Sequence, residues 1–238
     1  MDTRSVPTPS SPAAPTRPSP ESATRIFLRP IATPFPLGFM AMATASLILG
    51  GSELGWFSGA EERMVAVILI AFVSPLQVLA SGFGFLGRDT VAATGFGVQS
   101  GAWLVIGIDR LLSAPDHTSH VLGVFLLAAS AWLLLCTLGA TLGKLAPAAV
   151  LILVSVRYLL TALYQLTGAG GLEHAAGIVG VALVAPAGYV AFALELESLQ
   201  RRTVLPLLRR GRGAEAMEGD LAQQVAGVDR EAGVREQL

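Results

Sequence analysis

The apolar residues of this chain gather into six long stretches, separated by short polar or charged interruptions. Every stretch is close to the roughly 20 residues that a helix needs to cross a hydrocarbon core of about 30 Å. The stretches are continuously apolar rather than alternating, so they predict helices and exclude the strands of a β-barrel. We therefore expect an all-α integral membrane protein, a bundle of six transmembrane helices. The expected helices cover residues 35–54, 64–86, 90–112, 120–142, 146–167 and 174–196.

Two tails flank this bundle, which we place at residues 34–206. Residues 1–33 are rich in Pro and Ser and carry too few apolar side chains for a core, which predicts a disordered tail. The tail lacks the apolar segment of a secretory signal, so we expect the protein to keep it. Residues 207–238 mix Glu, Arg and Ala and predict a charged cytoplasmic tail. The connections between spans are too short to fold alone, so we expect the function to lie within the membrane.

Composition adds the expectation that the protein uses no redox or metal chemistry. Hydrophobic residues make up 53% of the chain and charged residues only 14%, about half of what soluble domains carry. The single cysteine, Cys136, excludes an internal disulfide, a cysteine zinc site and an iron–sulfur cluster. Asp116, His117 and His120 have metal-compatible side chains, but they share one outer loop, where solvated side chains are expected. We predict no metal, no cofactor and no catalytic residues, because no nucleophile and base lie at compatible depth.

Lysine and arginine residues are distributed unevenly between the two sides of the predicted bundle. Thirteen lie in the tails and in the two loops on their side, while only Arg63 and Arg110 lie on the other side. Cytoplasmic segments carry an excess of Lys and Arg, so the bias places both termini in the cytoplasm of a multi-pass cell-membrane protein. We interpret the uneven charge as an orientation signal and expect no nucleic-acid partner. The thirteen residues are Arg4, Arg17, Arg25, Arg29, Arg88, Lys144, Arg201, Arg202, Arg209, Arg210, Arg212, Arg230 and Arg235.

The first stretch begins with the residues Pro34-Phe35-Pro36-Leu37-Gly38-Phe39. This run resembles the N-P-A-P-L-G-L signature of the succinate–acetate permease family, also called acetate uptake transporters. Further matches follow in order, at Thr90, Ala93-Thr94-Gly95-Phe96, Leu122-Gly123-Val124-Phe125, His174-Ala175-Ala176-Gly177 and Gly180. The last match, Arg202-Thr203-Val204-Leu205-Pro206, is similar to the R-T-V-L-P that follows the last helix in that family. The resemblance covers residues 32–206.

The resemblance implies six-helix subunits that assemble as homo-hexamers, each enclosing its own pathway for acetate or succinate, generally with protons. It also implies a role in the pathway for the helix-one motif, which here comprises Thr33, Pro34, Pro36, Leu37 and Gly38. Thr33 replaces the family's Asn. Helix N-termini attract anions through unpaired N–H groups, so this end could hold a carboxylate. A plain helix start, where Pro is tolerated, explains the two prolines equally well.

The resemblance further assigns the narrowest part of the pathway. The family narrows its pathway with Phe, Tyr and Leu on helices one, three and five, and Met42, Gln99 and Val154 align with those positions. The Glu that the family carries near the end of helix two aligns with Gly84. The expected constriction therefore has less aromatic content and more polar character than in the family, which affects the expected choice of substrate.

One charged residue, Arg157, lies about halfway along a predicted span. Arg at that depth costs roughly 2.5–3.5 kcal/mol on translocon-derived scales, so a partner or a watery path is expected. Arg157 lies three residues from Val154 and so on nearly the same helix face. We hypothesise that its guanidinium attracts a carboxylate anion. Structural pairing with an acidic group or a backbone carbonyl is the equally weighted alternative. For Gln77 and Gln165 we favour hydrogen bonds between helices.

We therefore predict a membrane transporter or channel for small carboxylate anions, with protons as a candidate co-substrate. Its expected partners are the anion, the lipid bilayer and identical subunits. The anion would pass through a pore in each subunit, attracted by the helix-one motif and Arg157. A membrane scaffold or accessory protein that kept the fold and lost transport also fits the sequence. A water-accessible path lined by Gln99 and Arg157 favours transport, whereas a dry interior with Arg157 facing another protein favours the scaffold.

Overall fold

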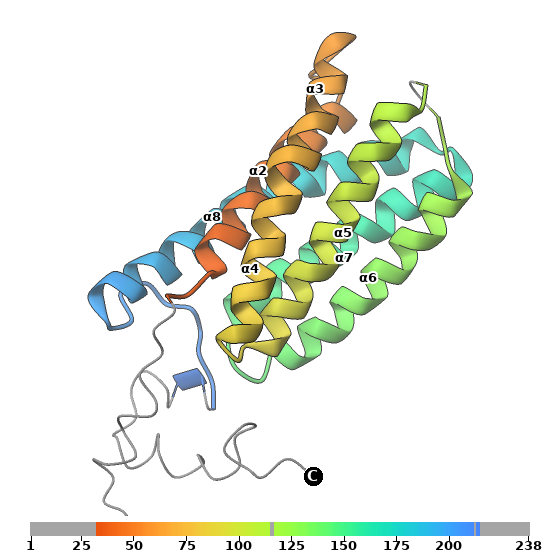
Figure 1. Cartoon of the computed structure of the whole chain (residues 1–238). Coiled ribbons are helices and arrows are strands. Elements are labelled where there is room, and N and C mark those ends of the chain that lie inside the picture. Colours follow the sequence, from red (N-terminus) through yellow and green to blue (C-terminus); the bar gives the residue numbers. More distant parts are fainter. Residues whose placement is uncertain (1–31, 115–116, 212, 215–238) are drawn as a thin grey trace, which may run out of the picture. The chain divides into compact units, whose positions relative to one another are not determined.

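The computed structural model describes residues 32–114, 117–211 and 213–214. Six helical spans, each long and apolar enough to cross a membrane, account for most of these residues (Figure 1). No strand occurs in the described part of the chain, so the predicted all-α bundle is confirmed. Most of the two predicted tails, residues 1–31 and 215–238, lies outside the described residues, as do Asp116 and Arg212.

The spans match the predicted stretches closely. Five consist of one α-helix, and the second joins two α-helices through a π-helical turn. The second span begins at Ala60, four residues before its predicted start, because Glu61, Glu62 and Arg63 extend the helix beyond its apolar part. The last span runs four residues further at both ends. The elements are α2 Phe35–Glu53, α3 Ala60–Ile68, η1 Leu69–Val73, α4 Ser74–Leu86, α5 Thr90–Leu112, α6 His120–Ala140, α7 Leu145–Thr167 and α8 Gly170–Gln200.

The π-helical turn η1 directly precedes Ser74 and Pro75 in the second span. Proline has no N–H, and in a regular α-helix its ring collides with the carbonyl group four residues earlier. A widened turn before Pro75 relieves that collision and lets both halves continue as one span. The turn contacts α2 and α5, so it lies inside the bundle.

Glycines bring the first and last spans into backbone contact. α2 packs along α8, and a Cβ on Gly50 would lie only 2.9 Å from the carbonyl oxygen of Gly177. A Cβ on Gly177 would in turn lie 3.0 Å from the carbonyl oxygen of Gly50. Small residues at helix crossings allow this approach in membranes, where van der Waals contact drives helix association.

The outward face of the bundle is apolar. On α6, Leu126 and Leu133 are fully buried, while Trp132, Leu135 and Leu138 point outward with more than half of their surface exposed. Water would penalise such a face, whereas lipid accommodates it. The exposed apolar residues therefore agree with a multi-pass membrane protein.

The segment after α8 folds back onto the α6–α7 turn. The carbonyl groups of Leu207 and Leu208 accept hydrogen bonds from the backbone N–H groups of Ala146 and Leu145, at 3.2 and 3.1 Å. These two N–H groups belong to the first turn of α7, where helical partners are missing. The side chain of Leu207 is buried. Residues just beyond the predicted boundary at 206 thus pack against the helical bundle.

The basic residues of the described loops lie mostly at one end of the bundle. The α4–α5 turn carries Arg88 and the α6–α7 turn carries Lys144, and both lie at the same end as the start of α2 and the end of α8 (Figure 1). At the opposite end are Arg63 and Arg110.

Candidate functional site

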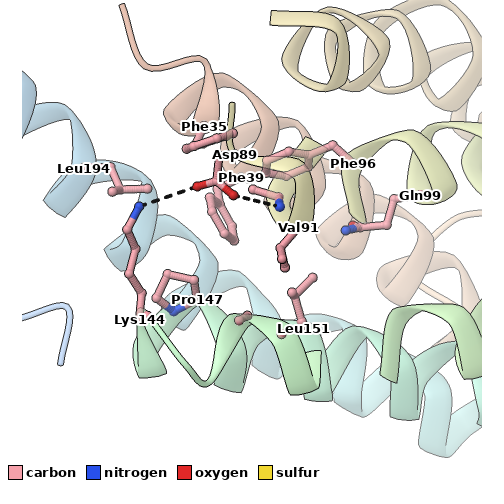
Figure 2. Close-up of a pocket in the computed structure, with 14 residues that line it drawn as sticks. Phe35, Phe39, Asp89, Val91, Phe96, Gln99, Lys144, Pro147, Leu151 and Leu194 are labelled. Carbon is pink, nitrogen blue, oxygen red and sulfur yellow. Dashed lines mark hydrogen bonds and ion pairs between the residues drawn. The ribbon is translucent and has the colours of Figure 1, made fainter. Parts of the chain in front are cut away.

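A cavity of about 140 Å³ opens at the end of the bundle that carries Lys144 (Figure 2). It lies between the start of α2, the start of α5, the α6–α7 turn and the end of α8. Its walls are mainly apolar. The lining residues are Phe35, Phe39, Asp89, Val91, Ala92, Phe96, Gln99, Gly139, Ala140, Gly143, Lys144, Pro147, Leu151 and Leu194.

One ion pair and a group of aromatic rings form the rim of this first cavity. Lys144 Nζ lies 3.8 Å from Asp89 Oδ2 and 5.7 Å from the centre of the Phe35 ring. Asp89 also caps α5, because its Oδ1 accepts a hydrogen bond from the backbone N–H of Ala92 at 3.1 Å. The pair joins the α4–α5 turn to the α6–α7 turn across the cavity (Figure 2). The rim therefore carries a charge pair that is neutral as a whole, and its cation also lies over an aromatic ring.

Gln99 forms the inner end of the first cavity. Its Oε1 accepts a hydrogen bond from Gln77 Nε2 at 3.4 Å, and the same Gln77 nitrogen lies 3.4 Å from the carbonyl oxygen of Gly38. These contacts confirm an interhelical role for Gln77. They hold the Gln99 amide by its oxygen, and its nitrogen is buried without a hydrogen-bond partner.

A second, smaller cavity of about 20 Å³ lies at the other end of the bundle. Arg110 on its wall donates from Nη1 to Ser52 Oγ at 2.6 Å and to Glu62 Oε2 at 3.0 Å. Gln165 Oε1 accepts a hydrogen bond from the backbone N–H of Ser119 at 2.7 Å. Ser119 caps α6, so this bond joins α7 to α6 and confirms the predicted hydrogen bond between helices. The lining residues are Leu49, Glu53, Ile106, Asp109, Arg110, Leu122, Thr161, Tyr164, Gln165 and Glu173.

Three rows of side chains, all buried except Arg110, connect the two cavities. Each row follows one helix at alternating steps of three and four residues, which keeps it on one face. Each begins with a residue of the first cavity and ends with two residues of the second, and the members between these line neither cavity. We call these middle members, namely Met42, Ser46, Trp103, Val154 and Tyr158, the closed section. The rows are Phe39, Met42, Ser46, Leu49 and Glu53 on α2; Gln99, Trp103, Ile106 and Arg110 on α5; and Leu151, Val154, Tyr158, Thr161 and Gln165 on α7.

Tight packing fills the closed section. Met42, Trp103 and Val154 are fully buried, and Tyr158 is 1% exposed. The rings of Trp103 and Tyr158 meet edge to face, with centroids 5.4 Å apart and planes at 73°. At a rise of 1.5 Å per residue, the α5 row spans about 10 Å from Gln99 to Ile106. The two cavities are therefore separated by a short plug of side chains.

Arg157 lies beside the closed section and is held on three sides. Its Nη2 donates to Glu53 Oε2 at 2.8 Å, and its Nη1 donates to the backbone carbonyl of Ser46 at 3.0 Å. Its guanidinium carbon lies 5.8 Å from the centre of the Trp103 ring. These partners are an acidic side chain and a backbone carbonyl, as the pairing alternative expects. The contacts tie α7 to α2 next to Gly180, where a Cβ would overlap Arg157 Nη1.

The helix-one motif lies at the start of α2, at the end of the bundle where the first cavity opens, and none of its five residues lines either cavity. α2 begins after Pro34, and the structure gives this end no capping side chain. Leu37 is 38% exposed, and Thr33, Pro34 and Pro36 are half-buried. Gly38 makes room for an aromatic ring, because its Cβ would lie 2.6 Å from Phe96. Two residues within or beside this motif, Phe35 and Phe39, line the first cavity.

Of the nine residues that the sequence nominates, the structure brings four to the region between the cavities. Gln99 lines the first cavity, Met42 and Val154 belong to the closed section, and Arg157 lies beside it. The sequence interpretation missed Trp103 and Tyr158, which follow Gln99 and Val154 by one helical turn and supply the aromatic rings. The spacing of four residues is the signal that could have found them.

The interpretation also missed Glu53, the partner of Arg157. Glu53 ends an apolar stretch, where acidic residues usually mark the membrane surface, and it lies 104 positions before Arg157. The requirement that a buried Arg have an acidic partner is the signal that pointed towards it. No group of three or more candidate metal ligands lies close together in the described residues, which omit Asp116.

Comparison with known proteins identifies relatives along most of the chain. The sequence model of the GPR1/FUN34/yaaH family matches residues 16–207. The succinate-acetate/proton symporter SatP of Escherichia coli K12 is 26% identical over 181 residues, covering 74% of this chain and 95% of that protein. SatP of Shigella flexneri gives the same figures. A solved structure of the bacterial acetate channel SatP superimposes with a TM-score of 0.65 at 25% identity, covering 74% of this chain and 99% of that one.

Proposed function

Because this chain belongs to the GPR1/FUN34/yaaH family, we propose that it carries small carboxylate anions such as acetate or succinate across a membrane. The chain is a multi-pass membrane protein, and its relatives are transporters or channels by name, so it is not an enzyme. The proposed pathway runs through the interior of one subunit, from the first cavity to the second.

The observation that carries this proposal is the alignment of the two cavities along the rows on α2, α5 and α7. A helical bundle that carries nothing has no need for a cavity at each end, or for rows of side chains that run from one cavity to the other. Here every row reaches both cavities, and only the closed section interrupts the path. Rotation of a few side chains there would join the cavities, and the flexible side chain of Met42 is the most easily moved.

The proposed roles follow from position along this path. Gln99 meets the anion in the first cavity, and Met42 and Val154 form the narrowest part together with the aromatic rings of the closed section. Arg157 lies beside the path and attracts the anion only weakly, because its ion pair with Glu53 offsets most of its charge. The helix-one motif, from Thr33 to Gly38, shapes the entrance.

Proton coupling, orientation and assembly belong to the same proposal. The E. coli and Shigella relatives are named as proton symporters, so we propose uptake with protons. The excess of basic residues at the end that holds the first cavity supports a cytoplasmic position for that end and for both termini. We further propose a homo-oligomer in the cell membrane, hexameric by the resemblance to the family.

Flux into proteoliposomes tests the proposed function. Purified full-length protein should take up labelled acetate, with succinate and lactate as further substrates and acetamide as a neutral control. An inward proton gradient should raise uptake of the anions above that of protein-free liposomes under the same gradient, and a protonophore should abolish that excess. No flux of any carboxylate by folded protein would contradict the proposal.

Two observations favour a transport-deficient scaffold as the second candidate. The middle of the interior is closed, and the charge of Arg157 is engaged by Glu53 within the same chain. A scaffold would be fully folded and would give no more carboxylate uptake than protein-free liposomes under the same proton gradient. The flux measurement therefore separates the two functions.

A further inference from the structure

Six buried polar side-chain atoms in the described residues have no hydrogen-bond partner. Buried polar atoms in native proteins are nearly always paired, because an unpaired one loses its contacts with water and gains none in return. Five of the six can donate a hydrogen bond, and only the Gln77 oxygen is purely an acceptor. The six atoms are Ser46 Oγ, Gln77 Oε1, Gln99 Nε2, Trp103 Nε1, Arg157 Nε and Tyr158 Oη.

These unpaired donors are concentrated between the two cavities. Ser46, Trp103 and Tyr158 are three of the five residues of the closed section, one from each of the helices α2, α5 and α7. Gln99 stands where the first cavity ends, and its nitrogen is buried there (Figure 2). Arg157 contacts the Trp103 ring directly. The donors therefore follow the same line as the proposed pathway.

We propose that the closed section is a binding site for one carboxylate group, held by the Ser46 hydroxyl, the Trp103 indole N–H and the Tyr158 hydroxyl. This inference rests on the proposed function and names the groups that recognise the substrate within it. The two oxygens of a carboxylate together accept about four hydrogen bonds, which matches a surplus of donors from three sides. Hydrogen bonds to a charged acceptor are about twice as strong as neutral ones.

The charges around the closed section allow a bound anion to be released again, which transport requires. Arg157 and Glu53 offset each other at 2.8 Å, so neutral donors hold the carboxylate, and no uncompensated cation traps it. In the closed conformation the donors are buried and have no hydrogen-bond acceptor, and an arriving carboxylate supplies acceptor oxygens. A neutral amide of the same shape brings one acceptor oxygen and no charge, so the site discriminates against it.

Substitution of Tyr158 by Phe tests the site, because it removes the hydroxyl group and keeps the ring. The acetate concentration that gives half-maximal flux should rise about tenfold to a hundredfold, the loss expected for one hydrogen bond to a charged group. The unfolding temperature without acetate should stay the same or rise, because an unpaired polar atom has been removed. Tyr189→Phe is the matched control. Tyr189 Oη donates a hydrogen bond to the Pro206 carbonyl at 2.9 Å, outside the proposed pathway. Loss of this hydroxyl group should leave the acetate concentration for half-maximal flux unchanged.

Ser46→Ala and a binding measurement complete the test. Ser46→Ala removes a second donor, on a different helix, and should also weaken the binding of acetate. In detergent, acetate should raise the unfolding temperature of the wild-type protein and raise it less in both variants, since a ligand stabilises the state it binds. Wild-type acetate affinity in both variants would overturn the site, as would a lower unfolding temperature of both variants without acetate. Absence of flux in the wild-type protein, with acetate stabilisation intact, would contradict the proposed function and leave the site supported.

Discussion

Arg157 and Glu53 form an ion pair whose side chains are 0% and 2% exposed. Moving two charges out of water is expensive, and their attraction repays this cost only while both partners are present. The backbone carbonyl of Ser46 supplies a further acceptor, at 3.0 Å from Arg157 Nη1. The packing of α2 against α7 therefore depends on these two side chains being present together.

Removal of one partner should be far more harmful than removal of both. Arg157→Met or Glu53→Gln alone should destabilise the folded protein by about 3–5 kcal/mol, because each leaves one buried group uncompensated. The double variant should recover most of that loss. Unfolding of purified protein in detergent measures the effect.

Glu62→Gln serves as the control for that series. It removes the partner of Arg110 in a pair whose side chains are 26% and 34% exposed, and such pairs contribute at most about 1 kcal/mol. Single variants of the buried pair that unfold like this control would show that Arg157 and Glu53 do not depend on each other.

At the level of elements, close packing of α8 against its neighbours positions the buried ion pair. Gly177 lets α8 touch the backbone of α2, and Gly180 one turn later leaves the space that the Arg157 guanidinium occupies. A Cβ at Gly180 would also lie 3.0 Å from the Ser46 carbonyl oxygen, the second acceptor of Arg157. One glycine thus sets both the helix spacing and the position of a charge.

Gly180→Ala should therefore destabilise the protein, by about 1–3 kcal/mol for overpacking alone and more if Arg157 leaves Glu53. Gly188→Ala on the same helix is the matched control, since nothing lies within 4 Å of its added Cβ. The control should be neutral or slightly stabilising, because Ala favours helix more than Gly does. Equal unfolding temperatures for the two variants would contradict this role of Gly180.

The sequence predicts the six spans because lipid requires long apolar helices, and their length and composition are local properties. It places the start of the second span four residues late, since charged residues can extend a helix beyond the membrane core. It does not reveal which glycines lie at crossings, because contacts such as Gly50 with Gly177 depend on how distant spans are paired.

The candidate site is predictable only in part for the same reason. The resemblance directs attention to Met42, Gln99 and Val154, and their roles in transport stay predictions. Trp103 and Tyr158 look like ordinary core aromatics in the sequence, and only the arrangement of helices places them side by side. The unpaired state of their polar atoms is a property of packing and has no local sequence signal.

At the scale of the whole molecule, polar and charged groups mark one line through an apolar bundle. The Lys144–Asp89 pair lies at the rim of the first cavity, and the closed section contains only uncharged side chains. The charged residues that line the second cavity are Arg110, Glu53, Asp109 and Glu173. Among the residues of this line, charges are therefore confined to its two ends, and its middle is closed. The central claim is that carboxylates cross through this line within one subunit.

Thiol modification at Met42 during acetate flux tests that claim most directly. In protein whose only native cysteine has been replaced by Cys136→Ala, Met42→Cys places a thiol in the closed section, and Glu61→Cys places one at the exposed start of α3, outside the apolar part of its span. The anionic reagent 2-sulfonatoethyl methanethiosulfonate should abolish acetate flux in the Met42→Cys protein, and saturating acetate should slow that loss. It should leave flux in the Glu61→Cys protein unchanged. Undiminished flux in the Met42→Cys protein after complete modification would contradict a pathway through the closed section.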